Sequence, residues 1–266
     1  MADFYAKFTE VEAATVAKAA EAMEVRPADR QHREMLDRAA DLTLPQGTRV
    51  LEVGCGTGGM ARLLARDARV REVVAVDPSP LLVARARQLA SGVPKLRFEV
   101  ADGTALTFGA SSFDTVVLHR VLSHVPHPEQ VLAEASRVLR RGGGLTIFDG
   151  DFATLNVGTG EHDPLESCVA AFVPAHVHDP WVVRQLTTLA AASGFVAGGL
   201  RSFDQVQMDD TEYVVSIVDR GAAALVAAGR IGAYLGEALK AEARRRARAG
   251  ALFVHLAYAC LMARKP

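Results

Sequence analysis

Cysteine, excess charge and long apolar runs are all scarce in this sequence of 266 residues, and each scarcity excludes a class of protein. The three cysteines, Cys55, Cys168 and Cys260, lie too far apart for a disulfide framework or a metal-binding cluster. Lys and Arg number 30 against 31 for Asp and Glu, so the net charge of -1 supplies no basic field for nucleic acid or anionic lipid. No apolar run reaches the roughly 20 residues of a membrane span.

The start of the sequence, Met1-Ala2-Asp3-Phe4-Tyr5, lacks the basic segment and apolar run of a secretory leader. We therefore expect a cytoplasmic protein, monomeric or homodimeric, that binds a small molecule and neither a membrane nor nucleic acid. Half of the residues are hydrophobic, which suffices for one large domain with an appended cap.

From residue 49 onward, short apolar runs alternate with stretches of helical periodicity. This alternation is typical of a parallel sheet with crossover helices, and it predicts a doubly wound α/β core. The core is expected over 48–206 and 251–266, after an Ala-, Glu- and Arg-rich helical cover over 1–47. The apolar runs are at 49–53, 72–76, 96–100, 113–118 and 145–149.

Beyond Asp149 the pattern weakens. Residues 150–180 carry Gly, Pro and His without a clear period, which predicts an active-site loop or an irregular cap. A helix near 181–193, a strand near 195–206 and a final strand near 252–261 are expected to follow. Apolar residues at helical spacing between Ile231 and Leu239 predict an amphipathic helix within a lid insertion over 207–250.

A glycine-rich loop follows the first apolar run. Glycine permits a sharp turn and close approach to a ligand, which the free amides of the next helix can then face. Gly54, Gly56 and Gly59 also satisfy the dinucleotide-binding pattern, and Asp77, 21 positions after Gly56, is where an acid would hold a ribose. Read alone, these residues fit a nicotinamide cofactor as well as another nucleotide-like ligand.

Further segments separate these alternatives. In their order and spacing they resemble the class I S-adenosylmethionine-dependent methyltransferases, particularly the branch that contains the ubiquinone and menaquinone C-methyltransferases. The resemblance covers roughly 48–150 and implies a seven-stranded, Rossmann-like methyltransferase sheet with S-adenosylmethionine as cofactor. The matching segments are LEVGCGTG at 51–58, VDPS at 76–79, ADGTALTF at 101–108, SFDTVVLHRVLSHVPHP at 112–128 and VLRRGGGLTIFD at 138–149.

The resemblance also implies a role for individual residues. Asp77 would hold the ribose, Asp102 the adenine amino group, and the glycines the methionine part of the cofactor. Pro78 and Leu81 would flank the adenine. The full set implied to contact the cofactor is Glu52, Gly54, Cys55, Gly56, Gly58, Asp77, Pro78, Leu81, Asp102, Gly103, Thr104, His119 and Arg120.

The expected reaction is methyl transfer to a small, partly hydrophobic molecule. The sulfonium is already an activated donor, so holding the nucleophile in line with the methyl group, together with a base if a proton must leave, can supply the catalysis. His119, Asp151 and His176 are the candidate catalytic residues, and Asp149 and His178 are further candidate bases. No metal is expected, because His176 and His178 lack a clear third ligand.

Two other functions remain open at this stage. A methyltransferase-fold protein could bind the cofactor structurally while it catalyses a non-methylating reaction or sequesters a ligand. An NAD-dependent oxidoreductase would use the same glycine loop, but it would leave Asp102 and Gly103 without a role. Cys55 is interpreted as a small loop residue and not as a nucleophile, since no base or metal partner is apparent.

Overall fold

A computed structural model of the chain describes residue 20, residues 44–207 and residues 211–266. The helical cover expected over 1–47 therefore lies outside the described residues, apart from Ala20 and 44–47. Among the described residues, no helix is long and apolar enough to cross a membrane.

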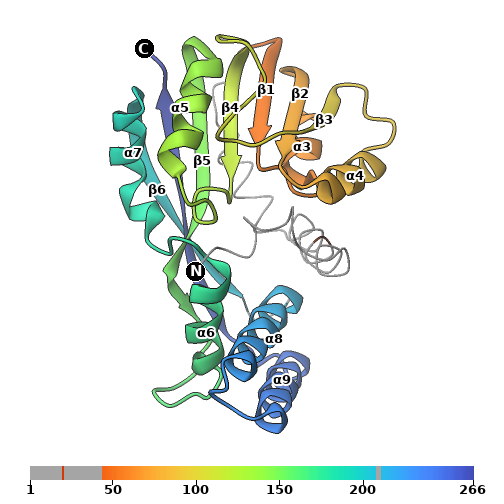
Figure 1. Cartoon of the computed structure of the whole chain (residues 1–266), viewed down its shortest axis with the longest axis vertical. Coiled ribbons are helices and arrows are strands. Elements are labelled where there is room, and N and C mark those ends of the chain that lie inside the picture. Colours follow the sequence, from red (N-terminus) through yellow and green to blue (C-terminus); the bar gives the residue numbers. More distant parts are fainter. Residues whose placement is uncertain (1–19, 21–43, 208–210) are drawn as a thin grey trace.

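Seven strands form a single sheet in the order β3-β2-β1-β4-β5-β7-β6 (Figure 1). Strands β1 to β5 pair in parallel, whereas β7 is antiparallel to both β5 and β6. This arrangement confirms the predicted doubly wound, seven-stranded fold. The strands are β1 (Thr48–Val53), β2 (Val70–Asp77), β3 (Leu96–Val100), β4 (Phe113–His119), β5 (Leu139–Asn156), β6 (Val196–Gln207) and β7 (Val254–Arg264).

Helices cover both faces of the parallel half of the sheet. Side chains of α3 and α4 pack with one face of β1 and β2, and those of α5 and α7 pack with the other face. Burial on both faces explains the nearly continuous apolar strands, such as Val73 to Val76 in β2. The helices are α3 (Gly59–Leu64), α4 (Pro80–Leu89), α5 (Pro128–Val138), α6 (Glu166–His176), η2 (Val182–Gln185), α7 (Leu186–Ala192), α8 (Glu212–Ala227) and α9 (Ala233–Arg248).

Two helices begin at residues that favour a helix start. Ser79 caps α4 by accepting a hydrogen bond from the Leu82 amide, and Pro80 occupies the first helical position. Pro128 likewise occupies the first position of α5, without a side-chain cap, and this helix ends at Val138, where β5 begins at once. The glycines at 142–144 lie within β5, before its buried part.

The sheet continues into a second, helical lobe. Strands β5, β6 and β7 run past the ends of the other strands toward α6, α8 and α9 (Figure 1). Here α6 packs against α8, and α8 against α9. A separate apolar core, which includes Phe152, Phe172, Ile217 and Leu239, joins these helices to the extended strands.

The prediction of an irregular segment over 150–180 was wrong. Strand β5 continues to Asn156 and helix α6 spans Glu166–His176, because Phe152, Leu155 and Phe172 are buried in the second core. Glycines and prolines in this stretch hide the periodicity from sequence reasoning. Helix α8 was also missed, although Val214, Ile217, Val218, Gly221, Ala222 and Leu225 are buried at helical spacing.

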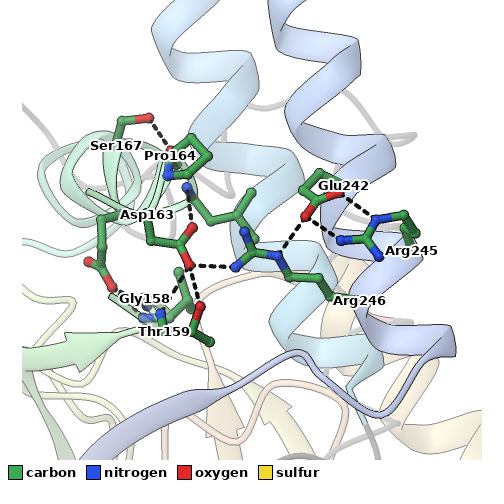
Figure 2. A network of polar contacts seen from close by, with 11 residues as sticks. Gly158, Thr159, Asp163, Pro164, Ser167, Glu242, Arg245 and Arg246 are labelled. Carbon is green, nitrogen blue, oxygen red and sulfur yellow. Dashed lines mark hydrogen bonds and ion pairs between the residues drawn. The ribbon is translucent and has the colours of Figure 1, made fainter. Parts of the chain in front are cut away.

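A polar network ties the 157–165 connection to α9 (Figure 2). The Asp163 carboxylate accepts hydrogen bonds from the amide and hydroxyl of Thr159, the Leu165 amide and the Arg246 guanidinium. The side chains of Asp163 and Arg246 are only 3% and 14% exposed. Burial alone would raise the pKa of Asp163, but these donors hold it below its usual range.

Replacing Arg246 by methionine is expected to destabilise the protein by about 2 kcal/mol. The buried Asp163 carboxylate would lose its only cationic partner among the described residues and keep only neutral donors, the Thr159 and Leu165 amides and the Thr159 hydroxyl. The matched control is Arg245→Met, since Arg245 pairs with Glu242 on the same helix but is exposed. Its cost should stay within about 0.5 kcal/mol. Urea unfolding at neutral pH measures both, and equal costs would contradict the assigned role.

The pH dependence of this pair has a definite sign. The pKa of Asp163 is lower in the folded protein, so its stabilising contribution is present above the unfolded pKa and is lost as the pH falls. The difference in stability between wild type and Arg246→Met should therefore shrink in acid.

Candidate active site

The glycine loop joins β1 to α3. The amides of Gly54 and Cys55 donate to the Val76 carbonyl at 2.8 and 2.9 Å, which holds the start of the loop against β2. Gly54, Gly56 and Gly58 have φ values of +75°, +54° and +78°, in the left-handed region that favours glycine. A Cβ at Gly58 would lie 2.5 Å from Phe98 Cζ, so this position also excludes a side chain on packing grounds.

Asp77 ends β2 and holds two loops at once. Its Oδ2 accepts the Gly56 amide at 2.8 Å and its Oδ1 accepts the Ser79 amide at 2.9 Å. The residue is buried, and burial raises the pKa of Asp77 to about 6. A carboxylate offers about four lone-pair positions, so two remain for ligand hydroxyl groups.

Glu52 and Cys55 lie beneath the loop and are protonated near neutral pH. Burial, followed by the charge of Asp77, raises the pKa of Glu52 to about 8. One Glu52 oxygen, Oε2, is buried and has no hydrogen-bond partner among the described residues, which is the kind of vacancy that a polar ligand group satisfies. Burial also raises the pKa of the Cys55 thiol well above its usual range, in agreement with its interpretation as a non-nucleophilic loop residue.

Asp102 follows β3 at the same edge of the sheet. Its Oδ1 accepts both the amide and the hydroxyl of Thr104 at 2.8 Å, so Oδ2 is not used by any hydrogen bond in the described part of the chain. Gly103 is packed closely, since a Cβ there would lie 2.8 Å from Val53 Cγ1.

Apolar side chains are exposed at the neighbouring strand ends. Leu81 is 47% exposed and Val100 is 48% exposed, and Pro78 also faces solvent. Sequence reasoning named Pro78 and Leu81 but missed Val100, whose only signal is its place at the last position of β3, two residues before Asp102. Together with the acids and the glycine loop, these residues fit a ligand that has an apolar base, a ribose and a polar tail.

A row of aromatic rings begins where β4 ends and crosses the neighbouring strands on one face. His119 stacks on Phe148 with ring centroids 5.3 Å apart, and Phe148 stacks on Tyr258 at 5.2 Å. Phe203 is tilted 49° to Phe148 at 6.4 Å. The rings come from β4, β5, β7 and β6, which are consecutive in the sheet, and we call them the aromatic row.

Arg120 comes directly after β4. Its amide donates to the Phe148 carbonyl at 2.7 Å, and its side chain donates to the Tyr258 hydroxyl. The sequence resemblance placed Arg120 beside the cofactor. In the structure its guanidinium contacts β7, which lies on the side of β4 away from β1.

The two aspartates of β5 do not face the aromatic row. Successive side chains of a strand alternate between faces, so Asp149 and Asp151 lie on the face opposite Phe148. Asp149 is fully buried and accepts hydrogen bonds from the Ser123 amide and hydroxyl and from the Gly150 amide. Asp151 accepts a hydrogen bond from Arg184 Nε at 3.0 Å. The other oxygen of Asp151, Oδ1, is buried without a hydrogen-bond partner among the described residues. Neither aspartate, however, lies on the face of the aromatic row.

His176 is also placed away from the glycine loop. It ends α6 in the helical lobe, where its Nδ1 lies 3.1 Å from the Phe172 carbonyl and its ring stacks on Phe172. The backbone amide of His178 donates to the Ser123 carbonyl at 2.9 Å. Within the ranges that the structure describes, no three His, Cys, Asp or Glu side chains gather to hold a metal ion.

Comparison with known proteins assigns the segment that forms the parallel strands to a family. Residues 51–147 match a family model described as a methyltransferase domain. These residues form a class I S-adenosylmethionine-dependent methyltransferase domain. The nicotinamide interpretation of the glycine loop therefore has no support.

Curated relatives are similar to part of the chain. The 2-methyl-6-phytyl-1,4-hydroquinone methyltransferase of Synechocystis sp. is 40% identical over 107 residues, which are 40% of this chain and 33% of that protein. The demethylmenaquinone methyltransferase of Thermus thermophilus is 36% identical over 115 residues, which are 42% of this chain and 52% of that protein. The chain thus spans about a third to a half of the length of these relatives.

The fold continues beyond the methyltransferase domain in similar solved structures. The [4+2]-cyclase SpnF superposes with a TM-score of 0.58 over 88% of this chain and 81% of its own, at 24% identity. At this level of identity the similarity concerns the fold alone.

Substituting Gly58 by alanine is expected to weaken S-adenosylhomocysteine binding at least tenfold, because the added Cβ must displace Phe98 and move the loop. Gly47→Ala is the matched control, since Gly47 has a similar φ of +73° but nothing within 4 Å of a built Cβ. It should cost about 1 kcal/mol of stability and leave binding unchanged. Calorimetric titration measures the affinities, and an equal loss in both variants would contradict the packing argument.

Binding of S-adenosylhomocysteine should also depend on pH through Asp77. The pKa of Asp77 is about 6, so its carboxylate is ionised at pH 7 and largely protonated at pH 5. If the ribose hydroxyls donate to the carboxylate, the affinity falls about tenfold between these values. Asp77→Asn should bind weakly at both pH values.

Glu52→Gln provides the control for this titration. With a pKa of about 8, Glu52 is already neutral between pH 5 and pH 7, so glutamine should preserve the pH profile. A profile that is flat in the wild type, or that becomes flat in Glu52→Gln, would contradict the assignment to Asp77.

Proposed function

We propose that the protein transfers the methyl group of S-adenosylmethionine to a small, partly hydrophobic acceptor. The observation that carries this proposal is the convergence of three strand ends, where the glycine loop, Asp77 and Asp102 form one polar edge, which we call the cofactor edge. Ligands of open α/β sheets bind at this edge, and the spacing from β1 to β3 suits a nucleoside with a charged tail.

Each residue would contact a different part of the cofactor. Asp77 would accept the ribose hydroxyls, and Oδ2 of Asp102 would accept the adenine amino group between Leu81 and Val100. The loop amides and Glu52 would face the methionine part. When bound, the sulfonium supplies a methyl carbon whose bond to sulfur breaks as a bond to the acceptor forms, with the electron pair retained by sulfur and the acceptor proton released.

The aromatic row is the proposed wall of the acceptor site. It starts at the partly exposed His119, beside the cofactor edge, and ends at the partly exposed Phe203, with the buried rings of Phe148 and Tyr258 between them. A planar ring that contacts the exposed part of His119 would be oriented toward the sulfonium, and such positioning lowers the barrier without a change in the chemistry. The two relatives named for hydroquinone and demethylmenaquinone methylation are consistent with an acceptor of this shape.

His119 is the candidate catalytic residue that the geometry supports. It lies at the junction of the aromatic row with the glycine loop, whereas Asp151 faces Arg184 and His176 lies in the helical lobe. We propose His119 as the group that positions the acceptor or takes its proton.

A second candidate function follows from the fold shared with the [4+2]-cyclase SpnF. The same site could hold the cofactor structurally while the aromatic row binds a molecule that undergoes another reaction. The two functions differ in one respect, since only methyl transfer consumes the cofactor.

The test is titration of the protein with S-adenosylmethionine, followed by incubation with a panel of phenols, hydroquinones and carboxylic acids. We expect binding in the micromolar range and a product heavier by one methyl group, with equimolar S-adenosylhomocysteine. Absence of binding at millimolar cofactor would overturn the proposal. Binding without product across the panel, with the cofactor unconsumed, would favour the second function.

Three further expectations remain proposals. We propose that 207–250 acts as a lid over the acceptor, with α8 and α9 as its helices. We propose the cytoplasm as the compartment, in keeping with three unpaired and buried cysteine thiols. A monomer or homodimer, with no nucleic-acid partner, is the proposed state.

A further inference from the structure

Arg120 has a backbone conformation that its residue type does not favour. Its φ is +59°, and Ser111 is the other non-glycine residue with positive φ in the described ranges. Such a conformation costs about 1–2 kcal/mol for a residue with a Cβ and persists where the surroundings impose it. Strain of this kind concentrates at functional sites, so Arg120 is a candidate functional residue.

The turned backbone carries the guanidinium into an aromatic setting. It lies 4.8 Å from the Tyr258 ring centroid and 5.7 Å from that of Tyr213 on α8, and it donates to the Tyr258 hydroxyl. The Arg120 side chain therefore connects the end of β4 to both the aromatic row and the helical lobe.

This cation has no counter-ion within the described residues. No carboxylate there forms an ion pair with Arg120, and its Nη1 atom is buried without a hydrogen-bond partner. Arg120 itself is partly buried, and a positive charge with a buried, unpartnered nitrogen and no anion is costly, although the two aromatic faces offset part of the cost. The site is therefore suited to an anion that arrives with a ligand.

The position of Arg120 indicates which ligand brings the anion. The cofactor edge is formed by β1, β2 and β3, whereas Arg120 reaches across β5 to Tyr258 of β7. At that place the guanidinium of the partly exposed Arg120 lies over the buried Tyr258 ring, and the partly exposed His119 precedes Arg120 in the chain, where a planar acceptor would make contact.

We propose that Arg120, with Tyr258, binds an acidic oxygen of the methyl acceptor, such as a phenolate, an enolate or a carboxylate attached to a flat apolar framework. This inference rests on the proposed function and replaces the expectation that Arg120 contacts the cofactor. Arg120 would hold the acceptor in its deprotonated form, which is the better nucleophile.

The experiment uses the full chain saturated with S-adenosylhomocysteine and two probes of similar shape, 4-nitrophenolate and neutral 4-nitroanisole. The wild type is expected to bind the phenolate at least tenfold more tightly than the ether. Its phenolate absorption band should also persist at a pH below the probe's own pKa. Arg120→Met should abolish both effects while its affinity for S-adenosylhomocysteine stays within threefold.

Two further variants separate binding from folding. Arg120→Gly relieves the left-handed strain, so it should fold at least as well as Arg120→Met and show the same loss of phenolate preference. Arg184→Met is the matched control, because Arg184 also lies over an aromatic ring, 4.3 Å from the Trp181 centroid, but on the opposite face of the sheet. It should retain the full preference.

Two results would overturn the inference. Equal affinity of the wild type for the two probes would show that Arg120 does not form an anion site, even if S-adenosylhomocysteine binds normally. A tenfold or greater loss of S-adenosylhomocysteine affinity in Arg120→Met would assign the guanidinium to the cofactor. Failure of the wild type to bind S-adenosylhomocysteine at all would instead reject the proposed function.

Discussion

The two hydrogen bonds accepted by Asp77 are the interaction on which the cofactor edge depends. One carboxylate, at the end of a central strand, fixes the glycine loop through Gly56 and the start of α4 through Ser79. Because those amides come from consecutive crossover units, their common acceptor sets the spacing between the loop and the helix before any ligand arrives. The same carboxylate is buried, and its raised pKa is the cost of placing an acid where a ribose would need it.

A second constraint is the length of the last three strands. Strands β5, β6 and β7 extend beyond the parallel half of the sheet and carry a second apolar core with α6 and α8. Since the strands are continuous, the helical lobe is attached to the methyltransferase domain by backbone hydrogen bonds as well as by packing. Phe148, Tyr258 and Phe203 belong to this second core, so the same strands that support the lobe also form the aromatic row.

Much of the methyltransferase domain could be predicted because its signals are local. Glycines in the loop, Ser79-Pro80 at a helix start and alternating apolar runs each depend on residues near in sequence. The helical lobe was predicted poorly for the opposite reason. Phe152, Phe172 and Ile217 are buried by one another across long sequence separations, and the glycines and prolines between them hide the period of α6.

The sequence by itself determined the parallel part of the sheet and its family, since these depend on short motifs in a set order. Only the tertiary structure decided which candidates meet. It brought His119, Phe148 and Tyr258 together from three strands and turned Arg120 toward β7, while strand alternation placed Asp151 on the opposite face. The physical reason is that the face and direction of a side chain depend on strand register and backbone angle, which residues distant in the chain impose.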